Sequence, residues 1–301
     1  MPATESTGAS RAGAFEARRA DSSGTGRKKK QGRRGRMERQ VEEAYDRFVA
    51  RVRSVFGIEL GLYKKPQMMR RLMSLMRRRG FDDFDRFLEA LIADPKLRAE
   101  FVDRVTINVS EFFRNPELWA LLDREVLASL SAQPKLRLWS AACSTGEEPY
   151  TLLMLLRERR SLRGVDLLAT DIDEPALEKA RAARYEARSL VSVPPSFRER
   201  YFVRDGDGYR VVDELVRAVR FERHDLLRDP YPPGPFDVIV NRNVAIYFTE
   251  DGKAHLYRSL AAVLRPGGYL FVGGTEQIFS PERYGLRQVY PFIYQKQEVR
   301  P

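Results

Sequence analysis

The 301-residue sequence has very little cysteine and histidine. Cys143 is the single cysteine, and His224 and His255 are the two histidines. One thiol excludes an internal disulfide framework, which fits a reducing compartment and leads us to expect a cytoplasmic protein. One cysteine with two histidines also argues against a zinc site with nitrogen and sulfur ligands, so no metal is expected.

Long apolar runs and nucleotide-phosphate motifs are absent as well. The sequence has no run of about 18 apolar residues, so we expect no membrane insertion. Its N-terminus also lacks the apolar core of a secretory signal. Neither a G-x-G-x-x-G motif nor a P-loop occurs, which argues against NAD and ATP as cofactors.

Positive charge is abundant but unevenly distributed. The formal net charge is +11; residues 1–37 hold ten basic and three acidic residues, so this tail carries +7 and residues 38–301 carry +4. The tail is nearly free of large apolar residues, so we expect it to be disordered. Its basic run at 27–36 is either a solvated tail or a contact for acidic partners or nucleic acid, unless Met37 is the true start.

Residues 38–131 are predicted to form an N-terminal helical domain and a linker. Apolar residues recur at helical spacing in 41–52, which predicts the first helix. Proline at a helix start and glycine at a helix end mark the boundaries of later helices. These are expected from Pro66 to Gly80, over 82–93, over 95–105, and from Asn115-Pro116 to about residue 130.

From residue 132 to 301, short buried strands alternate with helices, which predicts a doubly wound α/β sheet. The segment 205–208 predicts the turn of a β-hairpin, which we place in a small antiparallel insertion over about 184–218. The expected strands are 136–140, 165–170, 219–222, 236–240 and one that ends at 272, and the expected helices are 149–158, 174–183 and 250–264.

A loop of small residues, 141–146, follows the first predicted strand and leads into a helix. Ligands of open α/β sheets bind beyond the carboxyl ends of the strands, where small residues permit close approach. Glu147 and Glu148 at the helix start would repel a pyrophosphate and attract a cation. S-adenosylmethionine (SAM) carries two cationic groups, a sulfonium and an α-amino group. The alternative interpretation is simple compensation of the helix dipole.

Further polar residues follow the later strands. Asp171 lies 25 residues after Gly146 of the first loop. This is close to the ~20 residues expected for a side chain that binds ribose hydroxyls. Asp173 is a candidate helix N-cap. The segment 224–227 either contacts adenine through a polar residue and a leucine or packs at the strand end. Residues 241–248 are placed to meet a substrate, and the linker at 106–116 could cross the pocket mouth and present Arg114.

Together, segments 108–116, 139–150, 169–173, 241–248 and 274–276 resemble the chemotaxis receptor glutamate methyltransferases, the CheR family, in its Gram-positive-like branch. The resemblance extends over residues 40–296. It implies a Rossmann-like SAM-dependent methyltransferase domain, an N-terminal all-α domain and an inserted antiparallel β subdomain. It also implies transfer of a methyl group from SAM to glutamates on chemoreceptor cytoplasmic helices, with S-adenosylhomocysteine as the product.

The resemblance also implies roles for particular residues. Arg114 and Tyr247 would face the reacting centre, and Ala245 departs from the family, which usually has a larger apolar residue there. Glu148 is favoured over Glu147 as the cofactor ligand. The implied SAM contacts are Asn108, Ser110, Arg114, Glu148, Asp171, Asp225, Leu226, Asn241 and Arg242.

The implied chemistry needs few catalytic groups. A glutamate with a pKa of about 4.3 is already ionised at neutral pH and needs no general base, which agrees with the scarcity of histidine. The basic helix that starts near Pro66 is the candidate docking surface for the receptor. Its Arg70, Arg71 and Arg77 are complementary to the glutamates that receptor helices present. The alternative is a core-packed helix with a solvated basic face.

Two other functions remain open at this point. A SAM-dependent RNA or DNA methyltransferase would use the basic tail, although residues 241–244 lack the motif typical of base-flipping enzymes. A SAM-sensing module without activity would not need Arg114 and Tyr247. We expect a monomer, no stable nucleic-acid partner, and no receptor peptide bound on the β subdomain.

Overall fold

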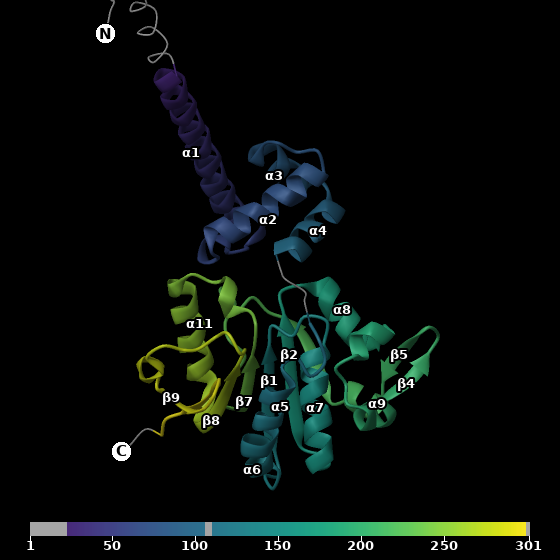
Figure 1. Ribbon diagram of the computed structural model, residues 1–301. Helices are drawn as coiled ribbons and strands as arrows, with labels where there is room; N and C mark the ends of the chain where they lie inside the picture. Colours follow the sequence, from purple (N-terminus) through teal and green to yellow (C-terminus); the bar gives the residue numbers. More distant parts are fainter. Residues whose placement is uncertain (1–22, 106–109, 299–301) are drawn as a thin grey trace, which may run out of the picture.

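The computed structural model describes residues 23–105 and 110–298. Figure 1 shows a small helical domain above a larger α/β domain, with a compact β insertion at one side of the latter. This arrangement confirms the predicted fold class, with a doubly wound sheet, an N-terminal all-α domain and a small antiparallel sheet.

The helical domain is built from helices whose apolar faces meet in one core. Phe48, Leu72, Phe87 and Phe101 are fully buried there, one from each of the four helices. Proline in the first turn of α2 and the Asp83 side chain at the start of α3 fix two helix boundaries. The elements are α1 (Ser23–Phe56), the 3-10 helix η1 (Leu60–Leu62), α2 (Lys65–Arg78), α3 (Phe84–Ala93) and α4 (Pro95–Val105).

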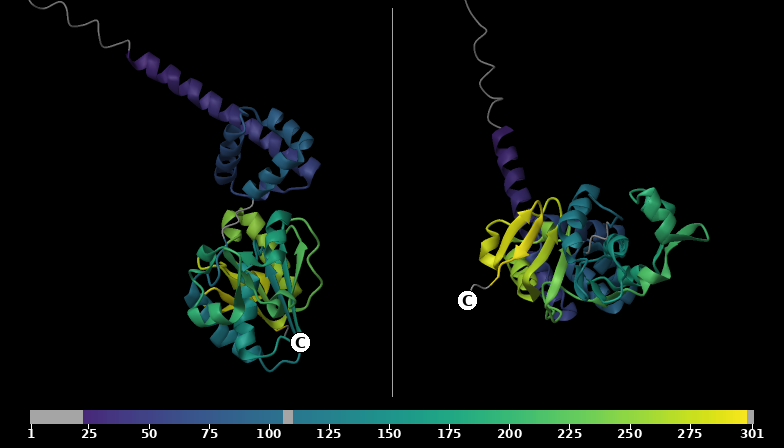
Figure 2. Two further views of the ribbon diagram at one scale, coloured as in Figure 1. Left: turned by 90° about the vertical axis from the view of Figure 1, so that its right-hand side faces the viewer. Right: turned by 90° about the horizontal axis from the view of Figure 1, so that it is seen from below.

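The start of α1 differs from the prediction of a disordered tail over 1–37 in one part, since residues 23–37 are helical. Residues 1–22 lie outside the described part of the chain, and the N-terminal part of α1, which begins at Ser23, projects away from both domains (Figure 2). Its lysine, arginine and glutamine residues are good helix formers, but its four glycines are poor ones, so the extension depends on the packed part of α1, from which it continues without new nucleation. Composition alone does not reveal this extension, because the segment adds little apolar surface.

The α/β domain is organised around a seven-stranded sheet in the order β6-β2-β1-β7-β8-β10-β9. The first five strands in this order are parallel, and β10 is antiparallel to both of its neighbours. The strands are β1 (Leu136–Ala141), β2 (Val165–Asp171), β6 (Val219–Arg223), β7 (Phe236–Asn241), β8 (Leu264–Val272), β9 (Leu286–Tyr290) and β10 (Ile293–Lys296).

Helices cover both faces of this sheet (Figure 1). Successive residues of β1 point to opposite faces, so Leu138 belongs to one buried cluster and Trp139 to the other. The helical elements are α5 (Pro116–Leu122), the π-helical turn η2 (Asp123–Leu127), α6 (Ala128–Leu130), α7 (Glu147–Arg159), α8 (Glu174–Ala182), η4 (Ala245–Tyr247), α11 (Glu250–Val263) and η5 (Pro281–Tyr284).

The β insertion lies between α8 and β6. Its three-stranded antiparallel sheet has the order β3-β5-β4, and β4 and β5 form the hairpin around residues 205–208. Its elements are β3 (Arg184–Tyr185), η3 (Ala187–Leu190), α9 (Pro195–Tyr201), β4 (Phe202–Asp205), β5 (Gly208–Val211) and α10 (Asp213–Val216). The terminal strands β9 and β10 have no counterpart among the predicted elements.

The two domains meet through an interdomain bridge formed by residues 62–64 and 247–249. The amide of Lys64 donates to the carbonyl of Tyr247 at 2.8 Å, and the amide of Thr249 donates to the carbonyl of Leu62 at 2.7 Å. Between these hydrogen bonds, Tyr63 and Phe248 form an antiparallel β-bridge. The hydrogen bonds of this bridge therefore join main-chain groups alone.

Candidate active site

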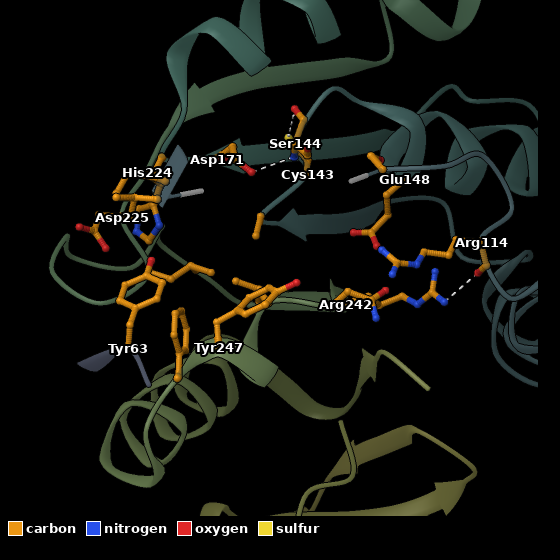
Figure 3. A pocket seen from close by; sticks show the side chains of 18 of the residues that line it. Tyr63, Arg114, Cys143, Ser144, Glu148, Asp171, His224, Asp225, Arg242 and Tyr247 are labelled. Carbon is orange, nitrogen blue, oxygen red and sulfur yellow. Dashed lines mark hydrogen bonds between the residues drawn. The ribbon is translucent and has the colours of Figure 1, made fainter. Parts of the chain in front are cut away.

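A pocket opens at the carboxyl ends of the central parallel strands, as expected for this sheet type. It is lined from the sheet domain, the linker and the helical domain (Figure 3). Its lining residues are Tyr63, Val105, Ser110, Glu111, Arg114, Ala142, Cys143, Ser144, Glu148, Asp171, Ile172, His224, Asp225, Leu226, Arg242, Asn243, Val244, Tyr247 and Phe248.

The loop after β1 brings backbone close to this pocket. Ala142, Ser144 and Gly146 all have positive φ, at 70°, 49° and 95°. A side chain at Gly146 would meet the Cβ of Ala180 and the hydroxyl of Tyr185 at 2.9 Å, so only glycine fits the packed turn. The small residues of this loop thus serve its tight geometry as well as ligand approach.

Asp171 stands at the end of β2 and is buried. Its two carboxylate oxygens accept hydrogen bonds from the amides of Ser144, at 2.8 Å, and Asp173, at 3.0 Å. Burial raises the pKa of Asp171, and these backbone donors oppose the increase. Asp173 occupies the N-cap position of α8, but its side chain makes no capping hydrogen bond, contrary to the expected role.

Glu148 and Glu147 differ in orientation at the start of α7. Glu148 faces the pocket, and its Oε1 accepts a hydrogen bond from Ser140 Oγ at 2.8 Å. Glu147 instead accepts from Thr145 Oγ1 at 2.7 Å and does not line the pocket. Burial raises the pKa of Glu148 to about 7, while Arg242 and the Ser140 hydrogen bond act in the opposite direction.

Arg242 is a buried cation in the pocket wall. Its guanidinium carbon lies 5.1 Å from the ring centre of Trp119 and 4.9 Å from that of Phe271. Its Nη2 donates to the carbonyl of Arg114 at 2.8 Å, which ties β7 to the linker. Burial lowers the pKa of Arg242, and the nearby Glu148 carboxylate raises it.

Asn241 differs from its predicted role as a cofactor contact. It is buried and does not line the pocket, and its Nδ2 donates to the carbonyl of Ala141 at 2.9 Å. This hydrogen bond joins the carboxyl ends of β7 and β1. The side chain therefore supports the pocket wall from behind, because the strand end turns it toward the neighbouring strand.

The segment after β6 forms another side of the pocket. Asp225 accepts a hydrogen bond from the amide of Leu227 at 2.9 Å, and burial raises its pKa. His224 Nε2 lies 3.3 Å from the carbonyl of Pro230, and burial lowers the pKa of the His224 ring, which favours its neutral form. Leu226 adds an apolar surface to this side of the pocket.

Tyr247 lies in η4 at the pocket mouth, where the helical domain meets the sheet domain. The guanidinium carbon of Arg71, from α2, is 4.9 Å from the centre of the Tyr247 ring. Behind this segment the buried carboxylate of Glu276 accepts hydrogen bonds from the amides of Asn243, Gly273 and Ile246. A single side chain thus fixes the loop that presents Tyr247.

Two family models match the chain in succession. The "CheR methyltransferase, all-alpha domain" matches residues 43–106, and the "CheR methyltransferase, SAM binding domain" matches residues 108–290. The chain belongs to the CheR methyltransferase family. The predicted family is thereby confirmed, and the pocket just described lies in its SAM-binding domain.

Relatives described as chemotaxis protein methyltransferases match this chain over most of their own length. A chemotaxis protein methyltransferase of Listeria monocytogenes is 43% identical over 258 residues, which cover 85% of this chain and 98% of the relative. Those of Salmonella typhimurium and Borreliella burgdorferi are 36% and 32% identical, over 77% and 85% of this chain and 83% and 95% of the relatives.

The structure brings most of the predicted CheR site residues together. Ser110, Arg114, Glu148, Asp171, Asp225, Leu226, Arg242 and Tyr247 all line the pocket. Asn108 lies outside the described residues. Of the predicted docking residues, Arg70 and Arg77 are exposed on α2, whereas Arg71 is partly buried against Tyr247.

Sequence reasoning missed Tyr63, Val105 and Glu276 as parts of this site. Tyr63 and Val105 reach the pocket from the helical domain, and Glu276 acts through the amides of Asn243 and Ile246, which are 33 and 30 residues away in the sequence. Neither spacing nor composition marks such contacts. Among the described residues, no group of histidine, cysteine and acidic side chains is arranged to hold a metal ion, and no helix is suited to cross a membrane.

Proposed function

We propose that this chain transfers a methyl group from SAM to glutamate side chains of chemoreceptors and forms glutamyl methyl esters in chemotaxis adaptation. The observation that carries the proposal is that the Glu148 carboxylate and the cations Arg114 and Arg242 line the same pocket of a CheR-family SAM-binding domain. SAM is a zwitterion with an additional sulfonium, and this charge pattern is complementary to it.

The residues of the pocket fit the separate parts of the cofactor. Asp171, at the end of β2, suits the ribose hydroxyls, and Asp225 with Leu226 suits adenine. Glu148 suits the cationic groups of SAM, and Arg242 suits its carboxylate. Arg114 suits either that carboxylate or the carboxylate of the incoming glutamate. Ser110 completes this set, and Asn108 is assigned to it from the family resemblance. Asn241 supports the pocket wall through its hydrogen bond to the Ala141 carbonyl.

The reaction requires orientation more than proton transfer. When bound, the cofactor supplies the methyl carbon: a glutamate oxygen bonds to it, the carbon–sulfur bond breaks, and its electron pair stays on sulfur. Arg114 and Tyr247 orient the incoming carboxylate at the pocket mouth. Such alignment can supply roughly 7–11 kcal/mol of barrier reduction. A loose contact from Arg114 serves better than a tight ion pair, which would weaken the nucleophile.

The partner we propose is the cytoplasmic helical region of a chemoreceptor, bound by a monomer in the cytoplasm. Arg70 and Arg77 on the exposed face of α2 are complementary to its acidic surface. We expect no stable nucleic-acid partner, since the sheet domain presents no base-flipping motif.

Radiolabelled SAM offered with a receptor cytoplasmic fragment or with RNA tests this function directly. We expect label on the receptor fragment that mild base releases as methanol, as a methyl ester requires. A matched fragment with its acceptor glutamates changed to alanine should remain unlabelled. Label on RNA alone would support the rival nucleic-acid methyltransferase, and no label on any acceptor, despite SAM binding, would support a binding module.

A further inference from the structure

Tyr63 is a helical-domain residue inside the cofactor pocket. It lies between η1 and α2, in the segment that forms the interdomain bridge, and its side chain lines the pocket together with His224 and Asp225. In Figure 3 its hydroxyl points toward the side of the pocket where these two residues lie.

The position of the Tyr63 ring is fixed from two directions. Its backbone pairs with Phe248 across the interdomain bridge, and the hydrogen bonds of Leu62 and Lys64 flank it on both sides. Its ring meets the Phe248 ring edge to face, with centroids 5.0 Å apart. The phenol is therefore held in place before any ligand binds, which lowers the entropy that binding would cost.

The surroundings of the hydroxyl indicate which part of a ligand it would meet. Asp171 and Asp225 lie on this side of the pocket, whereas Glu148, Arg114 and Arg242 lie on the other (Figure 3). Burial, followed by the charges of these two aspartates, raises the pKa of Tyr63. The phenol therefore keeps its proton at neutral pH and is available as a hydrogen-bond donor.

We propose that Tyr63 is a cofactor-binding residue that covers the adenosine part of SAM and donates its phenolic hydrogen to an adenosine acceptor. The helical domain then completes the cofactor site and does not serve receptor docking alone. This inference rests on the proposed function only for the identity of the cofactor. The alternative is that Tyr63 merely packs the two domains together.

Calorimetric titration of SAM and S-adenosylhomocysteine into Tyr63→Phe and Tyr63→Ala tests the proposal. The phenylalanine variant keeps the ring and the backbone bridge, so loss of one hydrogen bond should raise Kd for both ligands about 3- to 10-fold. Loss of the ring in the alanine variant should raise Kd further. Tyr45→Phe, which removes another buried phenol of the helical domain, should bind like the wild type.

The outcomes separate this proposal from its alternative and from the proposed function. Equal Kd values for wild type and Tyr63→Phe would refute the hydrogen bond from Tyr63 to the adenosine. An unchanged Kd in Tyr63→Ala would refute the claim that the ring covers the adenosine. A lower unfolding temperature with unchanged Kd would identify a packing residue only. Since affinity is measured without an acceptor, a failure of receptor methylation would refute the function and leave this result standing.

Discussion

Glu148 should make the affinity for SAM depend on pH. In the free protein its carboxyl has a pKa of about 7, because burial disfavours the ionised form more than Arg242 and Ser140 favour it. A cationic cofactor binds the ionised form, so the protonated population must lose its proton before binding. The perturbation is therefore pH itself, with Glu148→Gln as the matched variant that keeps an acceptor for Ser140.

The expected size follows from the ionised fraction. For a pKa of about 7, this fraction rises from about 9% at pH 6 to about 91% at pH 8, so the apparent Kd should fall about tenfold over this interval. Near pH 7, each SAM bound should release about half a proton. The effect of pH on the stability of the free protein has the opposite sign. Because Glu148 ionises at a lower pH in the unfolded chain than in the folded protein, the protein loses stability as the pH rises from 4.5 through 7.

Titration calorimetry in two buffers of different ionisation enthalpy measures both quantities. The ratio of wild-type to Glu148→Gln affinity removes titrations that the two proteins share, including that of the ligand amino group. We expect this ratio to increase with pH and the variant to release about half a proton less than the wild type near pH 7. Parallel pH profiles with equal proton release would refute the assignment of Glu148 as the titrating ligand.

Other predictions concern turnover, docking and stability. Arg114→Ala should lower turnover about 100-fold with an unchanged unfolding temperature, and wild-type turnover would remove the residue from the mechanism. Charge reversal of Arg70 and Arg77 should raise the apparent KM for receptors up to about tenfold at low salt, and an unchanged KM would exclude docking through α2. Charge reversal of Arg71 should also lower kcat, because its guanidinium lies over the Tyr247 ring. Glu276→Ala leaves three backbone amides without their acceptor and should cost about 3 kcal/mol in denaturant unfolding, and a loss below about 1 kcal/mol would contradict this.

The fold was predictable wherever local signals and burial agree. Pro66 and Gly80 bracket α2, and the apolar run of β7 is buried at every position. Prediction failed where local signals conflict with tertiary structure or are weak. The basic start of α1 contains four glycines and has no apolar face, and β9 with β10 alternates too briefly to be distinguished from loop.

The candidate site was predictable for residues that follow strand ends. Asp171 and Asp225 are examples, because the topology of a parallel sheet gathers such residues at one edge. Asn241 also follows a strand end, yet the direction of its side chain depends on a hydrogen bond to β1 that no pattern encodes. Tyr63 depends on how two domains meet, which is information that no single segment contains.

The interdomain bridge has a consequence for how such a protein can change. Its two hydrogen bonds join main-chain groups of Leu62, Lys64, Tyr247 and Thr249. Glycine at position 252 allows this close approach, because a Cβ atom there would lie 3.0 Å from the Leu62 carbonyl oxygen. Main-chain groups are the same whatever the side chain. Substitutions on the exposed face of α2 should therefore leave this bridge intact, and with it the positions of Tyr63 and Tyr247 at the pocket.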